Sequence, residues 1–429
     1  MTPRVLYLCH NHPAVRPAGA ENYALEVHRA MARAGPYEPT LVARTGPPMA
    51  APRPARAPVL TQLSGGAREH LLHTDPGDWD DLLGTMRDKR LYTRVLRDLL
   101  ADLRPDVVHV QHTYLLGYDL LRVVRSSLPG VPIVYTLHEL LPICHHKGQM
   151  VRTWGGELCD RASPERCHAC FPGIAAQRFF LRTRFIQAQL ALVDRFICPS
   201  AFLAERFVAW GLPADRVLVE DYGRRDPPPA RERPAPTAPV RIGFFGQLSP
   251  FKGVDVLLEA ALALQRAGSP ARFVIHGAHL ELQTSAFRAR FEALLEAAAP
   301  TVRLHGAYRP EELDGLMADV DWVVVPSVWW ENSPLVIQEA FMRGRPVICS
   351  DIGGMAEKVD DGVSGLHFEA GSAEDLAATV ARATSEPGLW KRLRAGVPAV
   401  RPMSRHLTWL ADLYDALRAE RAAREPAHA

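Results

Sequence analysis

Short apolar runs alternate with amphipathic helical patterns along most of the chain. The run at residues 5–8 is followed by residues 21–34, where apolar side chains recur at helical spacing until Gly35. Similar short runs occur at residues 41–43, 106–110, 131–137 and 195–200. Most residues in these runs are apolar, which is typical of strands buried on both faces. The pattern therefore predicts a parallel sheet with helices on both sides.

The alternation is interrupted once and then resumes. Residues 224–239 contain six prolines and almost no apolar side chains, which predicts an interdomain linker. The same alternation returns over residues 240–400. We therefore expect an α/β fold of two Rossmann-like, doubly wound domains, residues 1–223 and 240–400, facing each other across a cleft. An apolar helix pattern in residues 401–429 follows the second sheet, and we expect it to return to the N-terminal domain.

Residues 78–103 have the pattern of one long amphipathic helix. The apolar positions on its inner side are Leu82, Met86, Val95, Leu99 and Leu103. The arginines on its outer side are Arg87, Arg90, Arg94 and Arg97. We favour a solvated face that nearby aspartates balance. Peripheral contact with an anionic membrane, or with an acceptor, is the alternative.

Composition narrows the class of protein. Of 429 residues, 47% are hydrophobic and 23% charged, as in ordinary globular proteins. The 50 basic and 48 acidic side chains nearly cancel, which argues against nucleic acid as a partner. No apolar run approaches the ~18–20 residues of a membrane span, and the first run is too short for a signal-peptide core, so we expect a cytoplasmic protein. Lysine is rare, with five residues against 45 arginines, so Lys252 stands out.

Three loops lie where doubly wound folds bind ligands, beyond the carboxyl ends of strands. The first contains Gly19 and Ala20 where a helix opens, and small side chains there let backbone N–H groups approach an anion. The second runs from Gly246 and Gln247 to Lys252, whose ammonium is placed to bind a phosphate. An ordinary surface lysine is the alternative.

The third loop, within residues 326–339, leads into a helix. Ser333 is a natural N-cap residue and Pro334 a natural first helical residue, so free backbone N–H groups there can bind a diphosphate. Glu331 lies before this helix and Glu339 more than one turn inside it, so both can face one pocket. The alternative is one acid in an exposed loop and another on a helix surface.

Four cysteines lie within 27 residues, inside an insert at about residues 139–173. They are Cys144, Cys159, Cys167 and Cys170, with the spacing C-x14-C-x7-C-x2-C. Four thiolates suit a closed tetrahedral site, so we expect a structural zinc ion. The alternatives are an iron–sulfur cluster, disulfides or free thiols. One cysteine ligand can also be replaced by His145, His146 or His168.

Several of these motifs together resemble family 4 of the retaining glycosyltransferases, which have the GT-B architecture of two facing Rossmann-like domains. The resemblance rests on Glu331 and Glu339 with seven residues between them, on Gly246-x5-Lys252-Gly253, and on Ser350-Asp351-Ile352-Gly353-Gly354-x2-Glu357. The family's N-terminal landmarks are matched by Gly19-Ala20-Glu21 and Thr136-Leu137-His138-Glu139. The resemblance thus covers nearly the whole chain.

The resemblance implies that the C-terminal domain binds a nucleotide-diphosphate sugar. Lys252 would neutralise the diphosphate, and Glu339 would bind the ribose hydroxyls. The same phosphates would bind the backbone of Ser333, Pro334 and Leu335. Gln247 stands where the family often has arginine, so one cation faces the phosphates in place of two.

The resemblance also implies that the N-terminal domain binds the acceptor. Glu331 and His138 would contact the transferred sugar. Gly19 would contact the diphosphate from the opposite wall. Ala20 follows it where the family has a second glycine. No metal ion is needed for transfer in this architecture.

We therefore expect a retaining glycosyltransferase that moves a sugar from a nucleotide-diphosphate donor to an acceptor. A nucleotide-sugar 2-epimerase of the same fold and a non-catalytic sugar-nucleotide-binding protein are the alternatives. The acceptor classes left open are saccharides, lipid-linked saccharides and small natural products, and the donor's base and sugar are open as well.

Overall fold

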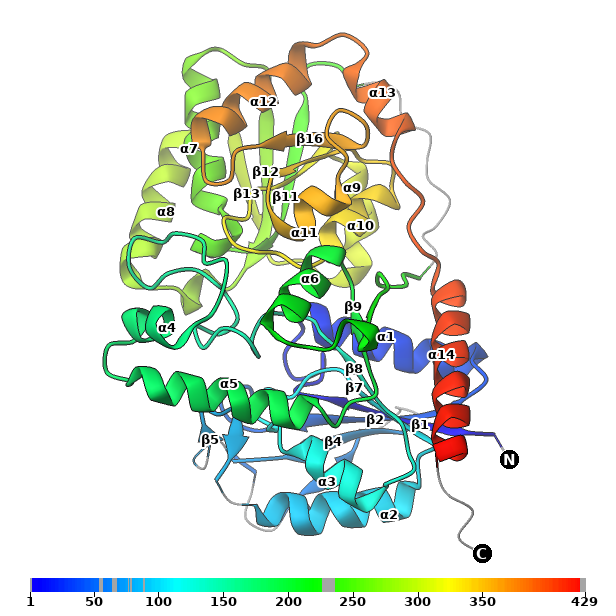
Figure 1. The fold of residues 1–429 in the computed structure, drawn as a ribbon. Helices are drawn as coiled ribbons and strands as arrows, with labels where there is room; N and C mark the ends of the chain where they lie inside the picture. Colours follow the sequence, from blue (N-terminus) through cyan, green and yellow to red (C-terminus); the bar gives the residue numbers. More distant parts are fainter. Residues whose placement is uncertain are drawn as a thin grey trace, which may run out of the picture. The chain divides into compact units, whose positions relative to one another are not determined.

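The computed structural model describes residues 2–53, 57–63, 68–75, 77, 79–87, 89–225 and 236–424. The chain divides into two compact units, Met1–Arg225 with Arg401–Ala429, and Asp226–Val400 (Figure 1). Most of the expected linker, residues 226–235, lies outside the described ranges. None of the described helices is long and apolar enough to cross a membrane.

An eight-stranded sheet forms the centre of the first unit. Its strands in spatial order are β10 (Val217–Val219), β9 (Arg195–Cys198), β8 (Ile133–Thr136), β7 (Val107–Val110), β1 (Arg4–Cys9), β2 (Glu38–Thr45), β4 (Glu69–His73) and β3 (Leu60–Gln62). All neighbouring pairs are parallel except β3 with β4. The chain passes from β1 to β2 on one side and later returns to β7 on the other. The loops after β1 and β7 therefore leave the same edge side by side.

Helices from both ends of the chain pack around this sheet. They are α1 (Gly19–Ala34), α2 (Arg97–Leu103), α3 (Leu120–Ser127), α4 (Pro164–Cys170), α5 (Ala176–Leu190), α6 (Ala201–Trp210) and α14 (Met403–Arg424). The final helix α14 lies beside α1 (Figure 1). Tyr37, just after α1, donates from its hydroxyl to Asp415 Oδ1 of α14 at 2.6 Å. The C-terminal helix is thus part of the first unit.

The expected helix over residues 78–103 is wrong in its first half. Strands β5 (Trp79–Asp80) and β6 (Thr85–Met86) pair antiparallel there, and a π-helix, η2 (Leu91–Leu96), precedes α2. Gly84 turns the chain with a φ of +64°, and a Cβ at this position would lie 2.7 Å from the Tyr118 ring. Arg87 therefore precedes the helix, so the arginine stripe does not lie along one helix face. The exposed arginines of the remaining helical segment are Arg90, Arg94 and Arg97.

The second unit contains a six-stranded parallel sheet. Its strands in spatial order are β13 (Val302–Gly306), β12 (Arg272–Ala278), β11 (Arg241–Gln247), β14 (Trp322–Val325), β15 (Val347–Ser350) and β16 (Gly365–Phe368). Its helices are α7 (Val254–Arg266), α8 (Ser285–Ala298), α9 (Leu313–Ala318), α10 (Leu335–Phe341), α11 (Gly353–Lys358), α12 (Ala373–Ser385) and α13 (Leu389–Ala395). Because β11 lies between β12 and β14, the loops after β11 and β14 adjoin at the carboxyl edge.

Strand β14 shows why the sheet is covered on both faces. Trp322 and Val324 belong to the apolar cluster on one face, and Val323 and Val325 to the cluster on the other. Successive side chains of a strand point to opposite faces. All four positions are therefore buried and apolar, and the predicted α/β fold with parallel sheets is confirmed.

Candidate functional site

Lys252 and Glu331 lie where the second sheet reverses its strand order. Lys252 ends a short 3₁₀ turn after β11, and Glu331 lies on the loop after β14. The Lys252 ammonium forms an ion pair with Glu331 Oε1. The Trp329 indole N–H and the Ser327 hydroxyl donate to the same oxygen, each at 2.9 Å. Two residues from separate loops are thus brought into direct contact.

Two glycines hold these loops together. Gly253 has a φ of +65°, and a Cβ there would lie 1.8 Å from the carbonyl oxygen of Pro326. A Cβ at Gly354 would lie 1.4 Å from the carbonyl oxygen of Asn332. The Gly354 N–H also donates to the carbonyl oxygen of Glu331 at 2.7 Å. Neither position has room for a side chain, so the two glycines fix the loop that carries Glu331.

Glu331 keeps its negative charge although it is buried. Burial disfavours the charged form, but the Lys252 charge and the hydrogen bonds to the carboxylate outweigh it and leave the pKa of Glu331 below its usual value. The Lys252 side chain is 27% exposed, against 10% for Glu331. An ammonium has three N–H donors, and the bond to Glu331 uses one. Lys252 can therefore bind a further anion from its open side.

Gly246 and Gln247 end strand β11, close to the turn that carries Lys252. Gln247 is exposed, so its amide is available at the carboxyl edge of the sheet. A Cβ at Gly277 of β12 would lie 2.4 Å from the carbonyl oxygen of Gly246. The backbones of Gly246 and Gly277 therefore approach each other closely at this part of the edge.

Helix α10 begins one residue later than the sequence indicates. Pro334 is the cap residue, with an extended ψ of 117°, and Leu335 is the first helical residue. The expected N-cap, Ser333, is buried just before it. Glu339 lies inside α10, and its charge adds to burial in raising the pKa of Tyr308. The loop and the helix thus carry one acid beside Lys252 and another beside Tyr308.

His138 is fixed between two polar partners in the first unit. Its Nδ1 lies 2.7 Å from Tyr222 Oη, and its Nε2 lies 3.1 Å from Gln111 Oε1. Burial, together with the nearby charge of His112, holds the pKa of His138 well below its usual value, so the ring is neutral at pH 7. A neutral ring that donates from Nε2 to Gln111 accepts at Nδ1 from the Tyr222 hydroxyl. Both ring nitrogens therefore orient the imidazole.

The strand-reversal point of the first sheet carries residues that sequence reasoning missed. His10, directly after β1, and His112, after β7, lie with their ring centroids 4.0 Å apart and their ring planes tilted by 40°. His10 Nε2 lies 3.0 Å from Glu21 Oε1. His112 Nε2 lies 2.7 Å from Glu139 Oε1. The sequence feature that could have identified both histidines is their place one or two residues after a buried apolar strand.

Gly19 and Ala20 form the first turn of the 16-residue helix α1. Gly19 is exposed, whereas Glu21, two residues later, is 4% exposed. Glu21 points to His10, as described above. The two small residues thus leave the backbone N–H groups of this helix N-terminus accessible.

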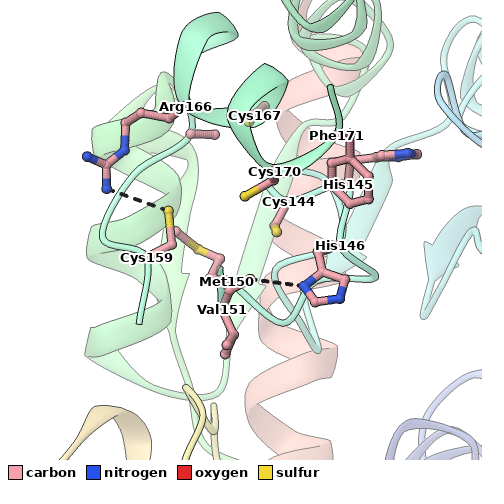
Figure 2. A pocket seen from close by; sticks show the side chains of 11 residues that line it. Cys144, His145, His146, Met150, Val151, Cys159, Arg166, Cys167, Cys170 and Phe171 are labelled. Atoms are coloured by element: carbon pink, nitrogen blue, oxygen red, sulfur yellow. Dashed lines mark hydrogen bonds between the residues drawn. The ribbon is translucent and has the colours of Figure 1, made fainter. Parts of the chain in front are cut away.

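The four cysteines of the insert line one pocket, with His145 and His146 beside them (Figure 2). None of these four described cysteines forms a disulfide bond. Among the described residues, no three His, Cys, Asp or Glu side chains converge closely enough to hold a metal ion as they stand. The four cysteines that the sequence suggested as zinc ligands therefore line one pocket, but their sulfur atoms are not arranged as the ligands of one ion.

Comparison with known proteins gives matches in both units. Residues 17–219 match the family described as Glycosyltransferase Family 4, and residues 239–386 match the family described as Glycosyl transferases group 1. Over 287 residues the chain is 31% identical to a GDP-mannose-dependent alpha-mannosyltransferase of Mycobacterium tuberculosis. Over 288 residues it is 32% identical to a D-inositol 3-phosphate glycosyltransferase of Rhodococcus jostii. The first match covers 66% of this chain and 64% of the relative, and the second covers 63% of this chain and 57% of the relative. The chain thus spans less than two thirds of the length of either relative.

A solved structure has a similar fold over nearly the whole chain. It is the Anabaena protein HepE in complex with UDP and glucose, with a TM-score of 0.65 and 15% identity. The match covers 96% of this chain and 100% of that one. At this identity the likeness concerns the fold alone.

Proposed function

The chain belongs to family 4 of the glycosyltransferases and has the GT-B fold, and we propose that it transfers a sugar from a nucleotide-diphosphate donor to a hydroxyl-bearing acceptor with retention of anomeric configuration. The contact between Lys252 and Glu331 carries this proposal. It places a cation and an ionised carboxylate at the strand-reversal point of the second unit, where doubly wound sheets bind ligands.

Lys252 would stabilise the leaving nucleoside diphosphate. As the bond between the anomeric carbon and the phosphate oxygen breaks, its electron pair stays on that oxygen, and negative charge grows there. A fixed ammonium with unused N–H donors favours this charge more strongly in the transition state than in the bound donor. Further backbone N–H groups for the phosphates would come from Ser333 and Leu335, while Pro334 between them has no N–H and shapes the turn that precedes α10. Gln247 would add a neutral donor from the end of β11.

Glu331 would hold the transferred sugar. Its contacts with Lys252, Trp329 and Ser327 all go to Oε1, so Oε2 is the oxygen that would accept from a sugar hydroxyl. Glu339 would bind the ribose hydroxyls. The name of the Mycobacterium tuberculosis relative, which is GDP-mannose-dependent, and the UDP complex of HepE support a nucleotide-sugar donor.

His138 would orient the sugar and not act as the base. Its ring is neutral, and its two nitrogens are bonded to Tyr222 and Gln111. In the proposed reaction the acceptor oxygen forms the new bond to the anomeric carbon, and its proton passes to the leaving phosphate. The acceptor would bind the first unit near the His10–His112 pair, where imidazoles and carboxylates suit a hydroxyl-rich molecule.

The test is to incubate the protein with nucleotide sugars and candidate acceptors. We expect a new glycoside whose anomeric configuration by NMR equals that of the donor. An inverted product would contradict retention, a new sugar nucleotide would indicate epimerisation, and donor binding without any product would indicate a binding protein. Glu331→Gln should lose transfer, while Glu311→Gln, at an exposed position of the same unit, should keep it.

A further inference from the structure

The four cysteines reach one pocket from three segments of the insert. Cys144 lies in a turn after β8, Cys159 follows a short antiparallel bridge, and two cysteines lie on α4. In Figure 2 the sulfur atoms of Cys144 and Cys170 point into the same space, while that of Cys159 turns toward Arg166. All four side chains line the pocket.

Backbone hydrogen bonds bring the two halves of the insert together. Val151 and Leu158 form an antiparallel bridge. The Cys159 N–H donates to the carbonyl oxygen of Met150 at 2.7 Å. Met150 is six residues from Cys144, so the bridge returns Cys159 to the turn that carries Cys144.

Helix α4 presents two thiols but buries no residue of its own. Cys167 and Cys170 are three residues apart, so they lie on the same face of the helix. Ser163 caps the helix by accepting from the Arg166 N–H at 3.2 Å. Because α4 has no buried side chain, its attachment to the rest of the insert rests on polar contacts, such as the bonds from Thr153 Oγ1 to the Cys170 carbonyl oxygen at 2.7 Å and from Arg152 Nη1 to the Arg166 carbonyl oxygen at 3.3 Å. Bonds from its two thiols to a shared ion would add a much stronger tie.

Two guanidinium groups balance the charge of such a site. Arg182 is 4% exposed and donates to the carbonyl oxygens of residues 141–143. Arg166 Nη2 lies 3.8 Å from Cys159 Sγ. A divalent ion with four thiolates has two surplus negative charges, which these two arginines match.

The size of the pocket favours a single ion. Its volume is about 20 Å³, which is close to the space needed by one water molecule. An iron–sulfur cluster, with several iron and sulfide atoms, needs more room. Thiolates are soft ligands that select zinc among the abundant divalent ions.

We propose that Cys144, Cys159, Cys167 and Cys170 bind one zinc ion in a closed, structural tetrathiolate site. Binding requires the thiols to converge, because they do not yet have ligand geometry. Cys159 Sγ must leave the carbonyl oxygen of Arg161, to which it now donates at 3.2 Å. Each thiol gives its proton to solvent and forms a Zn–S bond of about 2.3 Å. Four thiolates leave no open coordination position, so the ion takes no part in sugar transfer.

A zinc ion bound to Cys144 would also stabilise the segment just before it, residues 139–143. The Cys144 N–H donates to the carbonyl oxygen of Leu140 at 2.8 Å. The preceding residue, Glu139, is bonded to His112. Resting on the proposed function, we expect metal loss to reduce acceptor use while nucleotide binding by the second unit survives.

The first experiment measures metal content in tag-free protein that has met no chelator. We expect one zinc per chain by elemental analysis. Exchange into cobalt(II) should give the thiolate charge-transfer and visible bands of tetrahedral cobalt–thiolate sites. Protein that holds no zinc and takes up no cobalt would overturn the proposal, and so would iron with stoichiometric sulfide.

The second experiment assigns the ligands. Cys167→Ser combined with Cys170→Ser should lose the zinc and the cobalt bands. The matched control, Cys198→Ala combined with Cys349→Ala, removes two buried cysteines outside the insert and should keep one zinc per chain. His146→Gln should also keep it. Zinc retained in the double serine variant, or lost in the His146 variant, would overturn the four-thiolate assignment.

The third experiment needs no variant and so does not depend on folding. Maleimide labelling of the wild-type protein, mapped by mass spectrometry, should find the four insert cysteines protected together and exposed together after chelation. Independent labelling, or bonded cysteine pairs, would overturn the proposal. Zinc binding without sugar transfer would remove the proposed function and leave the zinc site in place, so the two failures are distinguishable.

Discussion

Glu331 shares a buried contact with Lys252 but is proposed to act on a different part of the donor. In Glu331→Gln we expect turnover at saturating donor to fall about 100-fold, because the contact with the reacting sugar is weakened. Affinity for the nucleoside diphosphate should stay the same or rise, because Lys252 loses its ion-pair partner. Initial rates and calorimetric titration with UDP and GDP measure the two effects. Unchanged turnover would contradict the assignment of Glu331.

Lys252→Ala should damage both binding and stability. The loss of the ammonium leaves the Glu331 carboxylate buried without its cation, which should destabilise the second unit by about 1–3 kcal/mol. Nucleotide affinity should fall at least about 10-fold, since charge-assisted hydrogen bonds contribute about 1.5–3 kcal/mol. Adding Glu331→Gln should restore stability but not affinity. Urea unfolding and nucleotide titration test this, with exposed Lys391→Ala as the control.

Glu339→Ala should weaken nucleotide binding about 10-fold and leave turnover at saturating donor nearly unchanged. The reason is that the ribose contact is remote from the reacting carbon, so it contributes equally to the bound donor and to the transition state. Glu374→Ala, an exposed acid on α12, is the matched control. A fall in turnover at saturation with unaltered affinity would reverse the roles given to the two carboxylates.

Helix α14 is attached to the first sheet by buried polar bonds as well as apolar packing. His109 Nδ1 lies 2.6 Å from Tyr414 Oη, and its Nε2 lies 2.7 Å from Thr136 Oγ1. Tyr23 of α1 lies 2.6 Å from His406 Nε2 of the same helix. Bonds of this kind require specific side chains, so they fix the position of α14 on the unit.

The attachment of α14 should weaken in acid. Burial lowers the pKa of His109 to about 3, while the unfolded chain has an ordinary histidine. Between about pH 6.5 and pH 3 only the unfolded state binds the proton, so stability falls as the pH falls, by up to about 1.4 kcal/mol per pH unit. Above about pH 6.5 this contribution is fully present.

Hydrogen exchange in α14 and β7, corrected for intrinsic rates, measures this stability at pH 7 and pH 5. His109→Gln should make the pH dependence shallower. His279→Asn, at a residue outside the first unit, should leave it as it is. An equal slope in the wild type and in His109→Gln would contradict the prediction.

The division into two units predicts separable responses of the whole molecule. A nucleoside diphosphate at about 100 times its dissociation constant should stabilise only the second unit, by about 2.7 kcal/mol. Zinc chelation should destabilise only the first. Hydrogen exchange resolved by peptide can follow both units in one sample. Nucleotide protection confined to the first unit would contradict the assignment of the donor site to Lys252 and Glu331.

Most of the central strands and part of the site could be expected from the sequence, and the failures have physical causes. The central strands are found because buried parallel strands need apolar side chains on both faces. The helix expected over residues 78–103 fails because Gly84, with its positive φ, turns the chain beside Tyr118. The helical spacing of apolar residues does not by itself reveal that turn. The His10–His112 pair was missed because its members lie about 100 residues apart in sequence and meet only through strand order.

By itself the sequence determined the α/β class, the two-unit organisation of the apolar pattern, and the loops that carry the motifs, because these depend on local periodicity and on residue type. Only the tertiary structure decided that Lys252 is ion-paired to Glu331, because sheet order brings together loops that are 79 residues apart. It also decided that Gly253 and Gly354 serve close backbone approach, since the carbonyl groups they meet belong to another loop. The four cysteines follow the same rule: their spacing is local, but the shared pocket exists because an antiparallel bridge and helix α4 fold back on the turn after β8.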